Sequence, residues 1–427
     1  MTDIEHLIVG AGISGLANAV RSRAEGTSVR VWEAGPQAGG VIRSVRDQGY
    51  LCELGPNTLM VNEPGVRGLL EKYRMWETAM DAAPQARKRF VVQGGKLVPI
   101  TPLNLFRILG LGGMVRLMGE PFCQRGVNPE EPLAQFAGRR LGQKALEELL
   151  GPFVSGIHAG DPERLITRHA FPRLYTLEQT HGSLSRALIF GPRRKMRRRL
   201  ISWAGGMQEL PDGLAKELGT DLCLNHPVDR IEKTREGYRV FGTGGGLTCQ
   251  KLTLATESAS AARLLTGLGI ETGLLAEIPH APMAVIHLGL DRSRITHPLD
   301  GFGFLISRRR GIRTLGMLFS SALFPGRAPE GKVLLTGFIG GRMDPTVLDM
   351  ADDRLIRQVL EDVRPLLGIR GGAEFARVTR WPRAIPQYEA GHGRVVESCE
   401  ELGRQFPGLH LAGSYRGGIA LGDRLRG

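Results

Sequence analysis

The 427-residue sequence predicts an α/β protein with one interrupted domain, a mixed α+β domain and a helical domain. Three observations predict this fold class. The chain opens with an apolar strand at residues 6–9, a glycine-rich turn, a helix and a second strand at residues 29–32. Residues 101–200 are mostly helical in their apolar spacing, and strand-like runs return after residue 200. A last apolar run at residues 409–412 is expected to rejoin the first sheet, which makes the first domain discontinuous.

The opening segment is predicted to bind a dinucleotide. Gly10 permits the tight turn after the strand, Gly12 lets a pyrophosphate approach bare backbone, and Gly15 lets the helix pack closely on the sheet. The helix then directs its free N–H groups at the phosphates. Glu33, at the end of the second strand, can accept both ribose hydroxyls and disfavours a 2′-phosphate. We therefore predict a Rossmann-type domain that binds FAD or NAD rather than NADP.

The remaining elements follow from periodicity and turn residues. Residues 87–92 are predicted to form a strand before a Gly94-Gly95 hairpin turn, residues 133–150 an amphipathic helix and residues 156–161 a loop. Further helices are expected at residues 210–218 and 352–367, and further strands at residues 228–231, 238–241, 252–256, 285–290, 302–306, 315–319 and 333–339. The predicted domains are a nucleotide-binding domain of residues 1–80, 201–265 and 375–427, a mixed domain of residues 81–100 and 266–374, and a helical domain of residues 101–200.

Composition and charge narrow the class of protein. Five scattered cysteines, with no C-x-x-C pair, suit a reducing compartment and argue against a disulfide framework or a zinc site. The acidic start leads directly into the first strand, so we expect no signal or transit peptide and a cytoplasmic location. The net charge of +13 attracts anions and is densest at residues 193–199. Aromatic side chains are not interleaved there and no nucleic-acid fold signature accompanies the cluster, which favours a solvated loop or contact with acidic lipid over nucleic acid.

One apolar segment, residues 102–122, has two interpretations. Arg107 and Arg116 interrupt it, so it contains no apolar run long enough to span a bilayer. It can lie at a membrane interface with its arginines toward anionic headgroups, on the inner face of the membrane, or it can form a core helix pair with two surface arginines. The sequence leaves both alternatives open.

No side-chain constellation for catalysis is visible. The sequence contains no Ser-His-Asp set, no G-x-S-x-G, no H-E-x-x-H and no P-loop. The histidines at positions 158, 169, 181 and 392 are expected to be isolated surface or capping residues. Without a protein nucleophile or a metal, the difficult chemical step must belong to the cofactor.

Several segments together resemble the protoporphyrinogen oxidase branch of the FAD-dependent amine oxidase-like superfamily. They are residues 10–40, 55–58, 156–161, 203–206, 301–305, 381–392 and 411–421. The resemblance implies oxidation of a porphyrinogen to a porphyrin, with hydride passing to FAD, electrons passing to molecular oxygen and hydrogen peroxide formed. It also implies a porphyrinogen substrate, and a homodimer is one assembly that we consider.

The resemblance assigns the site residue by residue. Arg89 would pair with a propionate, which suits a guanidinium, and Gly156, Leu305, Leu318 and Phe338 would enclose the apolar ring. From the residues alone, Leu305, Leu318 and Phe338 are better interpreted as sheet core. Arg89 is interpreted equally well as an exposed strand residue or as a binding residue. No side chain is assigned as catalytic. The residues assigned to FAD are Gly10, Ala11, Gly12, Ile13, Ser14, Gly15, Glu33, Ala34, Gly40, Val41, Gly55, Pro56, Asn57, Thr58, Val228, Trp381, Ser414, Ile419, Ala420 and Leu421.

The sequence departs from the family pattern at three places. Gln37 stands where arginine is usual, Ser414 where asparagine is common, and residues 422–427 end where relatives continue into a helix behind the flavin. The alternatives are therefore a coproporphyrinogen oxidase, a carotenoid- or squalene-type flavin desaturase, and a flavin-free porphyrin-binding protein inactivated by loss of that helix.

Overall fold

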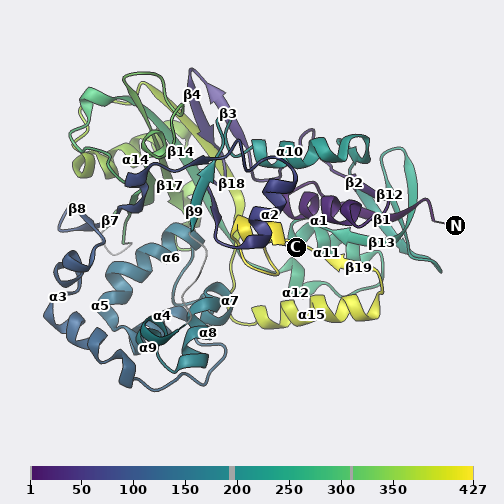
Figure 1. The fold of residues 1–427 in the computed structure, drawn as a ribbon, viewed down its shortest axis with the longest axis horizontal. Coiled ribbons are helices and arrows are strands. Elements are labelled where there is room, and N and C mark those ends of the chain that lie inside the picture. The colour runs from purple at the N-terminus through teal and green to yellow at the C-terminus, as the bar shows by residue number, and fades with distance from the viewer. Residues whose placement is uncertain (1, 192–197, 308–310, 427) are drawn as a thin grey trace.

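The computed structural model describes residues 2–191, 198–307 and 311–426 and contains two seven-stranded sheets and a helical region (Figure 1). The first sheet has the order β10-β2-β1-β13-β12-β11, with β19 paired to β13. Strands β1, β2, β10, β13 and β19 run parallel, whereas β11 and β12 are antiparallel additions. Its strands are β1 (Ile4–Val9), β2 (Val29–Trp32), β10 (Leu222–Cys223), β11 (Val228–Lys233), β12 (Tyr238–Gly242), β13 (Gly245–Leu254) and β19 (Leu409–Leu411).

Helices cover both faces of this sheet, because the central strand β1 presents apolar side chains on each face. Ile8 packs with α1 and α10, whereas Leu7 and Val9 pack with α11 and α15 on the opposite face. The pairing of β19 with β13 confirms the prediction that residues 409–412 rejoin the first sheet. The helices around it are α1 (Ile13–Ala24), α2 (Pro64–Lys72), α10 (Glu209–Leu218), α11 (Ser258–Thr266), α12 (Gly273–Ala276), α15 (His392–Gln405) and α16 (Leu421–Arg426).

The second sheet has the order β18-β14-β17-β16-β15-β7-β8, and α14 (Asp352–Leu367) covers one of its faces. Its edge strand β18 was expected in the nucleotide-binding domain; that assignment of residues 375–386 differs from the structure, where β18 pairs with β14 along its length. The strands are β7 (Arg89–Gln93), β8 (Lys96–Pro99), β14 (His280–Asp291), β15 (Gly303–Leu305), β16 (Thr314–Leu318), β17 (Lys332–Gly340) and β18 (Phe375–Pro386).

Two small sheets join these units. The hairpin of β3 (Ser44–Asp47) and β4 (Tyr50–Glu53) leads from the first sheet toward the second. A three-stranded sheet of β5 (Leu59–Val61), β9 (Arg199–Ser202) and β6 (Met80–Asp81) brings together segments far apart in the chain.

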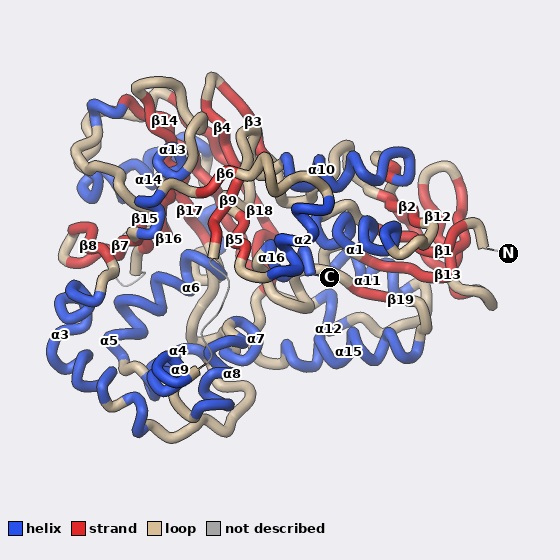
Figure 2. The backbone as a smooth tube through the Cα atoms, in the orientation of Figure 1, coloured by secondary structure: helices blue, strands red, loops and turns tan. Residues whose placement is uncertain are grey.

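The helical region packs below the second sheet, with α6 nearest to it (Figure 2). The continuous helix predicted for residues 133–150 is wrong, because Gly142 has a φ of 88° and interrupts it. The predicted loop at residues 156–161 is also wrong in part, since residues 156–158 end α6. The helices are α3 (Pro102–Met118), α4 (Leu133–Arg140), α5 (Gln143–Ala145), a π-helical turn (Leu146–Leu150), α6 (Gly151–His158), α7 (Thr167–Ala170), α8 (Pro172–His181) and α9 (Leu184–Phe190).

None of the helices within the described ranges has the length and apolarity needed to cross a bilayer. Helix α3 bends at Gly110, whose φ is 66°. Its Ile108 and Leu109 are buried against β7 and β8, so part of this segment is core, while much of the rest is exposed. The basic cluster at residues 193–197 lies outside the described residues.

Candidate functional site

The glycine turn has the geometry of a pyrophosphate cradle. A Cβ on Gly10 would lie 2.7 Å from the Ala255 carbonyl oxygen, and one on Gly15 would lie 1.9 Å from that of Gly10, so close packing requires both glycines. A Cβ on Gly12 would meet nothing within 4 Å. Gly12 also caps α1, whose N-terminal N–H groups receive no side-chain cap. Open space in front of free donors fits a bound phosphate group.

Glu33 lies beside this turn as expected. Its Oε2 accepts the Ala11 N–H at 2.7 Å and its Oε1 accepts the Gly35 N–H at 2.8 Å. Each carboxylate oxygen retains a further lone pair, which leaves acceptor capacity for ribose hydroxyls. Val228 begins β11 on the same sheet, and the preceding His226 N–H donates to the Glu33 carbonyl oxygen at 2.7 Å. The residues predicted to contact the adenine and the ribose, Ala34 among them, therefore lie close to one another.

A turn at Gly39-Gly40 contacts Gly12, and a second turn contacts the first. Gly39 forms a bridge with Gly12, and a Cβ on Gly40 would lie 3.4 Å from the Gly12 Cα. A Cβ on Gly55 would lie 2.0 Å from the Val41 carbonyl oxygen, so the two turns are in direct contact. The second turn comprises Gly55, Pro56, Asn57 and Thr58, and we call it the 55–58 turn. The predicted cofactor residues of three separate segments are therefore linked by direct contacts.

The C-terminal segment closes the same region. The Tyr388 hydroxyl donates to the Ser414 carbonyl oxygen, and Leu421 packs against the core that contains α1. Helix α16, which follows Ile419 and Ala420, contacts α1, β5 and α2. The Trp381 indole donates to the Leu54 carbonyl oxygen at 2.7 Å, which ties β18 to the start of the 55–58 turn.

The predicted substrate residues share one face of the second sheet, opposite α14, which we call the α6 face. In the sheet register, Leu305 lies opposite Gly316, and Gly316 lies opposite Phe338. Two residues earlier on β15, Gly303 lies opposite Leu318 on one side and opposite Arg89 on the other. Paired residues project to the same face, so these four side chains lie together. The alternate residues Phe90, Phe304 and Met317 are buried with α14.

Gly156 of α6 stands over this face. A Cβ there would lie 2.3 Å from Leu305 Cδ2, so the helix backbone is in direct contact with this side chain. Leu305, Leu318 and Phe338 are each partly accessible, unlike the fully buried residues on the α14 side. Their accessibility agrees with a role in lining a surface, although Phe338 also packs against the core cluster of Ala159, Ala281 and Leu315.

Arg89 occupies the end of the α6 face farthest from Trp381. It is exposed, and its guanidinium lies 4.9 Å from the centroid of the Phe302 ring. Among the described residues no carboxylate forms an ion pair with it. Because its charge is not neutralised within the described chain, Arg89 is available to an anionic group.

The histidines at positions 158, 169 and 392 are not isolated, and that prediction was wrong. The rings of His169 and His392 are 5.3 Å apart, Tyr388 stacks on His392 at 4.3 Å, and His158 faces Tyr388 edge-on at 6.5 Å. Burial lowers the pKa of both His158 and His392 to about 4. The Gln387 amide also donates to the His158 carbonyl oxygen at 2.9 Å. Two segments separated by more than 200 residues thus meet through neutral rings.

Sequence reasoning missed three buried polar residues near the 55–58 turn. Glu53, His287 and Arg327 are each less than 5% exposed. Glu53 ends an otherwise apolar strand two residues before the turn, so this charged residue was a usable signal. His287 and Arg327 lie on segments without any motif, and nothing local marks them.

Comparison with known proteins places the chain in a family. The model of the flavin-containing amine oxidoreductases matches residues 13–420. Protoporphyrinogen oxidase 2 of Arabidopsis thaliana is 30% identical over 98% of this chain and 91% of its own length, and the chloroplastic enzyme 1 of Spinacia oleracea is 32% identical over 99% and 82%. Coproporphyrinogen III oxidase of Bacillus subtilis is 26% identical over 98% and 94%.

Solved structures share the fold. One from Exiguobacterium sp. 255-15 superposes with a TM-score of 0.84 at 24% identity and covers 100% of this chain and 97% of its own. Reduced UDP-galactopyranose mutase gives a TM-score of 0.76 at 15% identity, covering 99% and 93%. Full-length matches and the geometry of the glycine turn agree, and the resemblance inferred from sequence is confirmed. The chain is an FAD-dependent oxidoreductase that belongs to the flavin-containing amine oxidoreductase family, in its protoporphyrinogen oxidase branch.

Proposed function

We propose that the protein oxidises protoporphyrinogen IX to protoporphyrin IX, with molecular oxygen as electron acceptor and hydrogen peroxide as by-product. The observation that carries the proposal is the α6 face. It combines partly accessible Leu305, Leu318 and Phe338 with an unneutralised Arg89 and begins at Trp381, beside the 55–58 turn. A broad apolar ring with acidic tails matches such a surface.

The residues of this chain would bind and orient rather than transfer protons. FAD, when bound, supplies the hydride acceptor and passes electrons to oxygen. Arg89 would hold a propionate and so fix the rotation of the ring about its normal. Gly156 and Leu305, which are in contact with one another, would together line one side of the ring and exclude water from it.

The cofactor assignment is tested at Gly12. Gly12→Asp should abolish FAD binding because a carboxylate would face the pyrophosphate, while the free space around Gly12 lets the chain fold. Flavin absorbance after dialysis and circular dichroism measure the two effects. Gly65→Asp is the matched control, because its Cβ also meets nothing within 4 Å and it lies on α2. Normal flavin loading of the Gly12 variant would refute the site.

The substrate assignment is tested at Arg89. Arg89→Ala should raise KM about tenfold or more with unchanged flavin content, since a charge-assisted contact contributes about 1.5–3 kcal/mol. Porphyrin fluorescence after addition of each porphyrinogen measures the rate. A coproporphyrinogen has four carboxylates rather than two, so a higher kcat/KM for it would favour the activity named for the Bacillus subtilis relative. Unchanged kinetics in the variant would remove Arg89 from the site.

We also propose peripheral contact with a membrane through the helical region. Exposed apolar side chains lie on α3, on the following loop and on the end of α9, and they are Leu103, Phe106, Leu111, Val115, Met118, Phe122, Val127, Leu188, Ile189 and Phe190. A set of this size on one region is unusual for a monomer in water. Sedimentation with anionic vesicles should retain the wild type and lose a Leu103→Glu/Leu111→Glu variant. Loss of a dimer in that variant, without any vesicle binding, would instead indicate contact between two copies.

A further inference from the structure

A small cavity with polar and apolar lining lies between β4, the 55–58 turn and the segment 320–327. Its volume is about 10 Å³, and its polar lining consists of Glu53, Asn57, Ser320 and Arg327. Ser320 begins the short helix α13 (Ser320–Leu323), which packs on β17. The cavity is large enough for about one water molecule and has several polar groups to hold it.

An ion pair forms one wall of this cavity. The guanidinium of Arg327 lies 3.3 Å from Glu53 Oε1, and the two side chains are 2% and 4% exposed. Glu53 Oε1 also accepts the Met207 N–H at 2.9 Å, and Arg327 Nη2 donates to the Ser202 hydroxyl at 2.6 Å. The pair therefore joins β4, the loop after β9 and the segment after α13.

The hydrogen-bonding capacity of this ion pair is not fully used within the described residues. Arg327 Nη1 is buried and has no hydrogen-bond partner among the described residues. Burial also lowers the pKa of Arg327, although Glu53 opposes this effect. A buried guanidinium N–H without an acceptor is costly, and an ordered water in the adjoining cavity would satisfy it.

The same junction is bonded to the α6 face. His287 Nε2 contacts the Glu53 carbonyl oxygen at 3.1 Å, and the hydroxyls of Ser320 and Thr336 are 2.7 Å apart. In the sheet register His287 lies opposite Thr336, and Thr336 lies opposite Leu318. The row of the sheet that carries Leu318 is thus linked through these contacts to the 55–58 turn.

We propose that Arg327 is a positioning residue that, through one ordered water in this cavity, holds Asn57 and the 55–58 turn at a fixed distance from the α6 face. This inference rests on the proposed function, in which that turn lies along the flavin and that face holds the substrate. Arg327 touches neither; it sets the relative placement of the groups that do.

The test uses the FAD-loaded protein and two variants. Arg327→Lys retains a cation for Glu53 but cannot supply both contacts of the guanidinium. It should bind FAD fully, shift the visible flavin spectrum, and lower kcat at least tenfold with KM within twofold. Arg327→Met should show the same pattern more strongly. Arg357→Lys is the control, because Arg357 forms an exposed ion pair on α14.

The possible results separate the two proposals. A wild-type spectrum and kcat in Arg327→Lys would overturn the positioning role, and Arg327→Lys alone decides if Arg327→Met does not fold. A crystal structure with no water between Arg327 Nη1 and Asn57 would also overturn it. If the wild type oxidises no porphyrinogen but Arg327→Lys still shifts the flavin spectrum, the proposed function fails while the contact with the flavin turn stands.

Discussion

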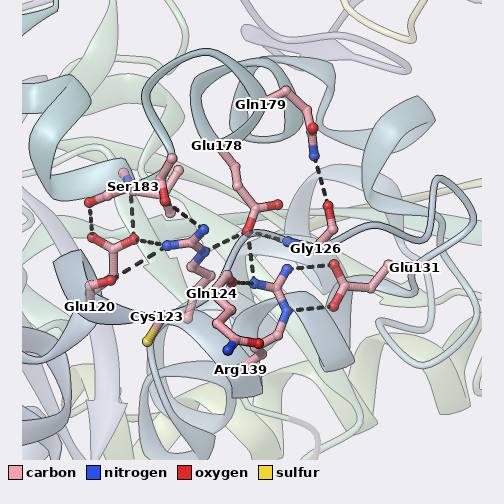
Figure 3. A network of polar contacts seen from close by, with 12 residues as sticks. Glu120, Cys123, Gln124, Gly126, Glu131, Arg139, Glu178, Gln179 and Ser183 are labelled. Atoms are coloured by element: carbon pink, nitrogen blue, oxygen red, sulfur yellow. Dashed lines mark hydrogen bonds and ion pairs between the residues drawn. The ribbon is translucent and has the colours of Figure 1, made fainter.

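Two buried ionic clusters in this protein differ in how completely their hydrogen bonds are satisfied. In the helical region, the fully buried Arg140 donates to Glu178 at 2.6 Å, to Glu120 at 3.0 Å and to the Gly182 carbonyl oxygen at 2.7 Å. Its partners Glu120 and Glu178 are labelled in Figure 3. Glu120 additionally accepts the Ser183 hydroxyl at 2.6 Å. Neither this arginine nor either carboxylate has a buried polar atom without a partner. At the junction between Glu53 and Arg327, by contrast, one guanidinium nitrogen has no hydrogen-bond partner among the residues that the structure describes.

The contrast teaches that burial of an ion pair does not by itself indicate a functional role. Burial alone would raise the pKa of Glu120, but hydrogen bonds from Ser183, Ser185 and Leu184 lower it to about 2. Burial raises the pKa of Glu53 despite the nearby Arg327. A saturated cluster fixes one packing of α4, α8 and α9, whereas an unsaturated one retains capacity for a water or a moving neighbour.

The largest effect is expected in the saturated cluster. Arg140→Met should destabilise the protein by about 3–5 kcal/mol, because it leaves Glu120 buried without its cation and leaves Glu178 with Arg139 alone. Urea unfolding followed by circular dichroism measures the loss. Arg404→Met, at an exposed pair with Glu401, should change stability by less than about 0.5 kcal/mol. A loss below about 1 kcal/mol at Arg140 would mean that the cluster contributes little.

A smaller effect is expected at the junction. Arg327→Met should cost about 1–3 kcal/mol, since a single carboxylate remains and it keeps the Met207 N–H. The raised pKa of Glu53 favours its protonated form in the folded state, so the deficit should shrink as the pH falls. Urea midpoints compared at neutral and mildly acidic pH test this. A deficit equal to that of Arg140→Met would erase the difference between the clusters.

The smallest effect concerns the pH dependence of stability. Burial lowers the pKa of His287 to about 4, so its contribution is complete above the ordinary value of 6.5 and is lost as the pH falls through 4. The contribution of Glu120 is complete above 4.5 and is lost only as the pH approaches 2. His287→Gln should therefore reduce the change of the urea midpoint with pH between pH 6.5 and 4, whereas Glu120→Gln should not. Equal slopes in both variants would contradict this order.

Much of the first sheet and of the cofactor site was predictable. Gly10, Gly12, Gly15 and Glu33 act within one continuous strand-turn-helix-strand segment, and their tasks follow from local backbone geometry. The substrate residues were predicted only through resemblance to a family. Alternation within a strand shows that Leu305 and Gly303 share a face, but not which residues of other strands join them.

The sequence by itself determined the dinucleotide turn and the class of the fold, because spacing and glycine conformation act over a few residues. Only the tertiary structure decided that β18 belongs to the second sheet, that three histidines meet around Tyr388, and that Arg327 reaches Glu53. Each of these depends on contacts between segments more than 80 residues apart along the chain. Local periodicity carries no information on such pairings, which are selected by packing and by the satisfaction of buried polar groups.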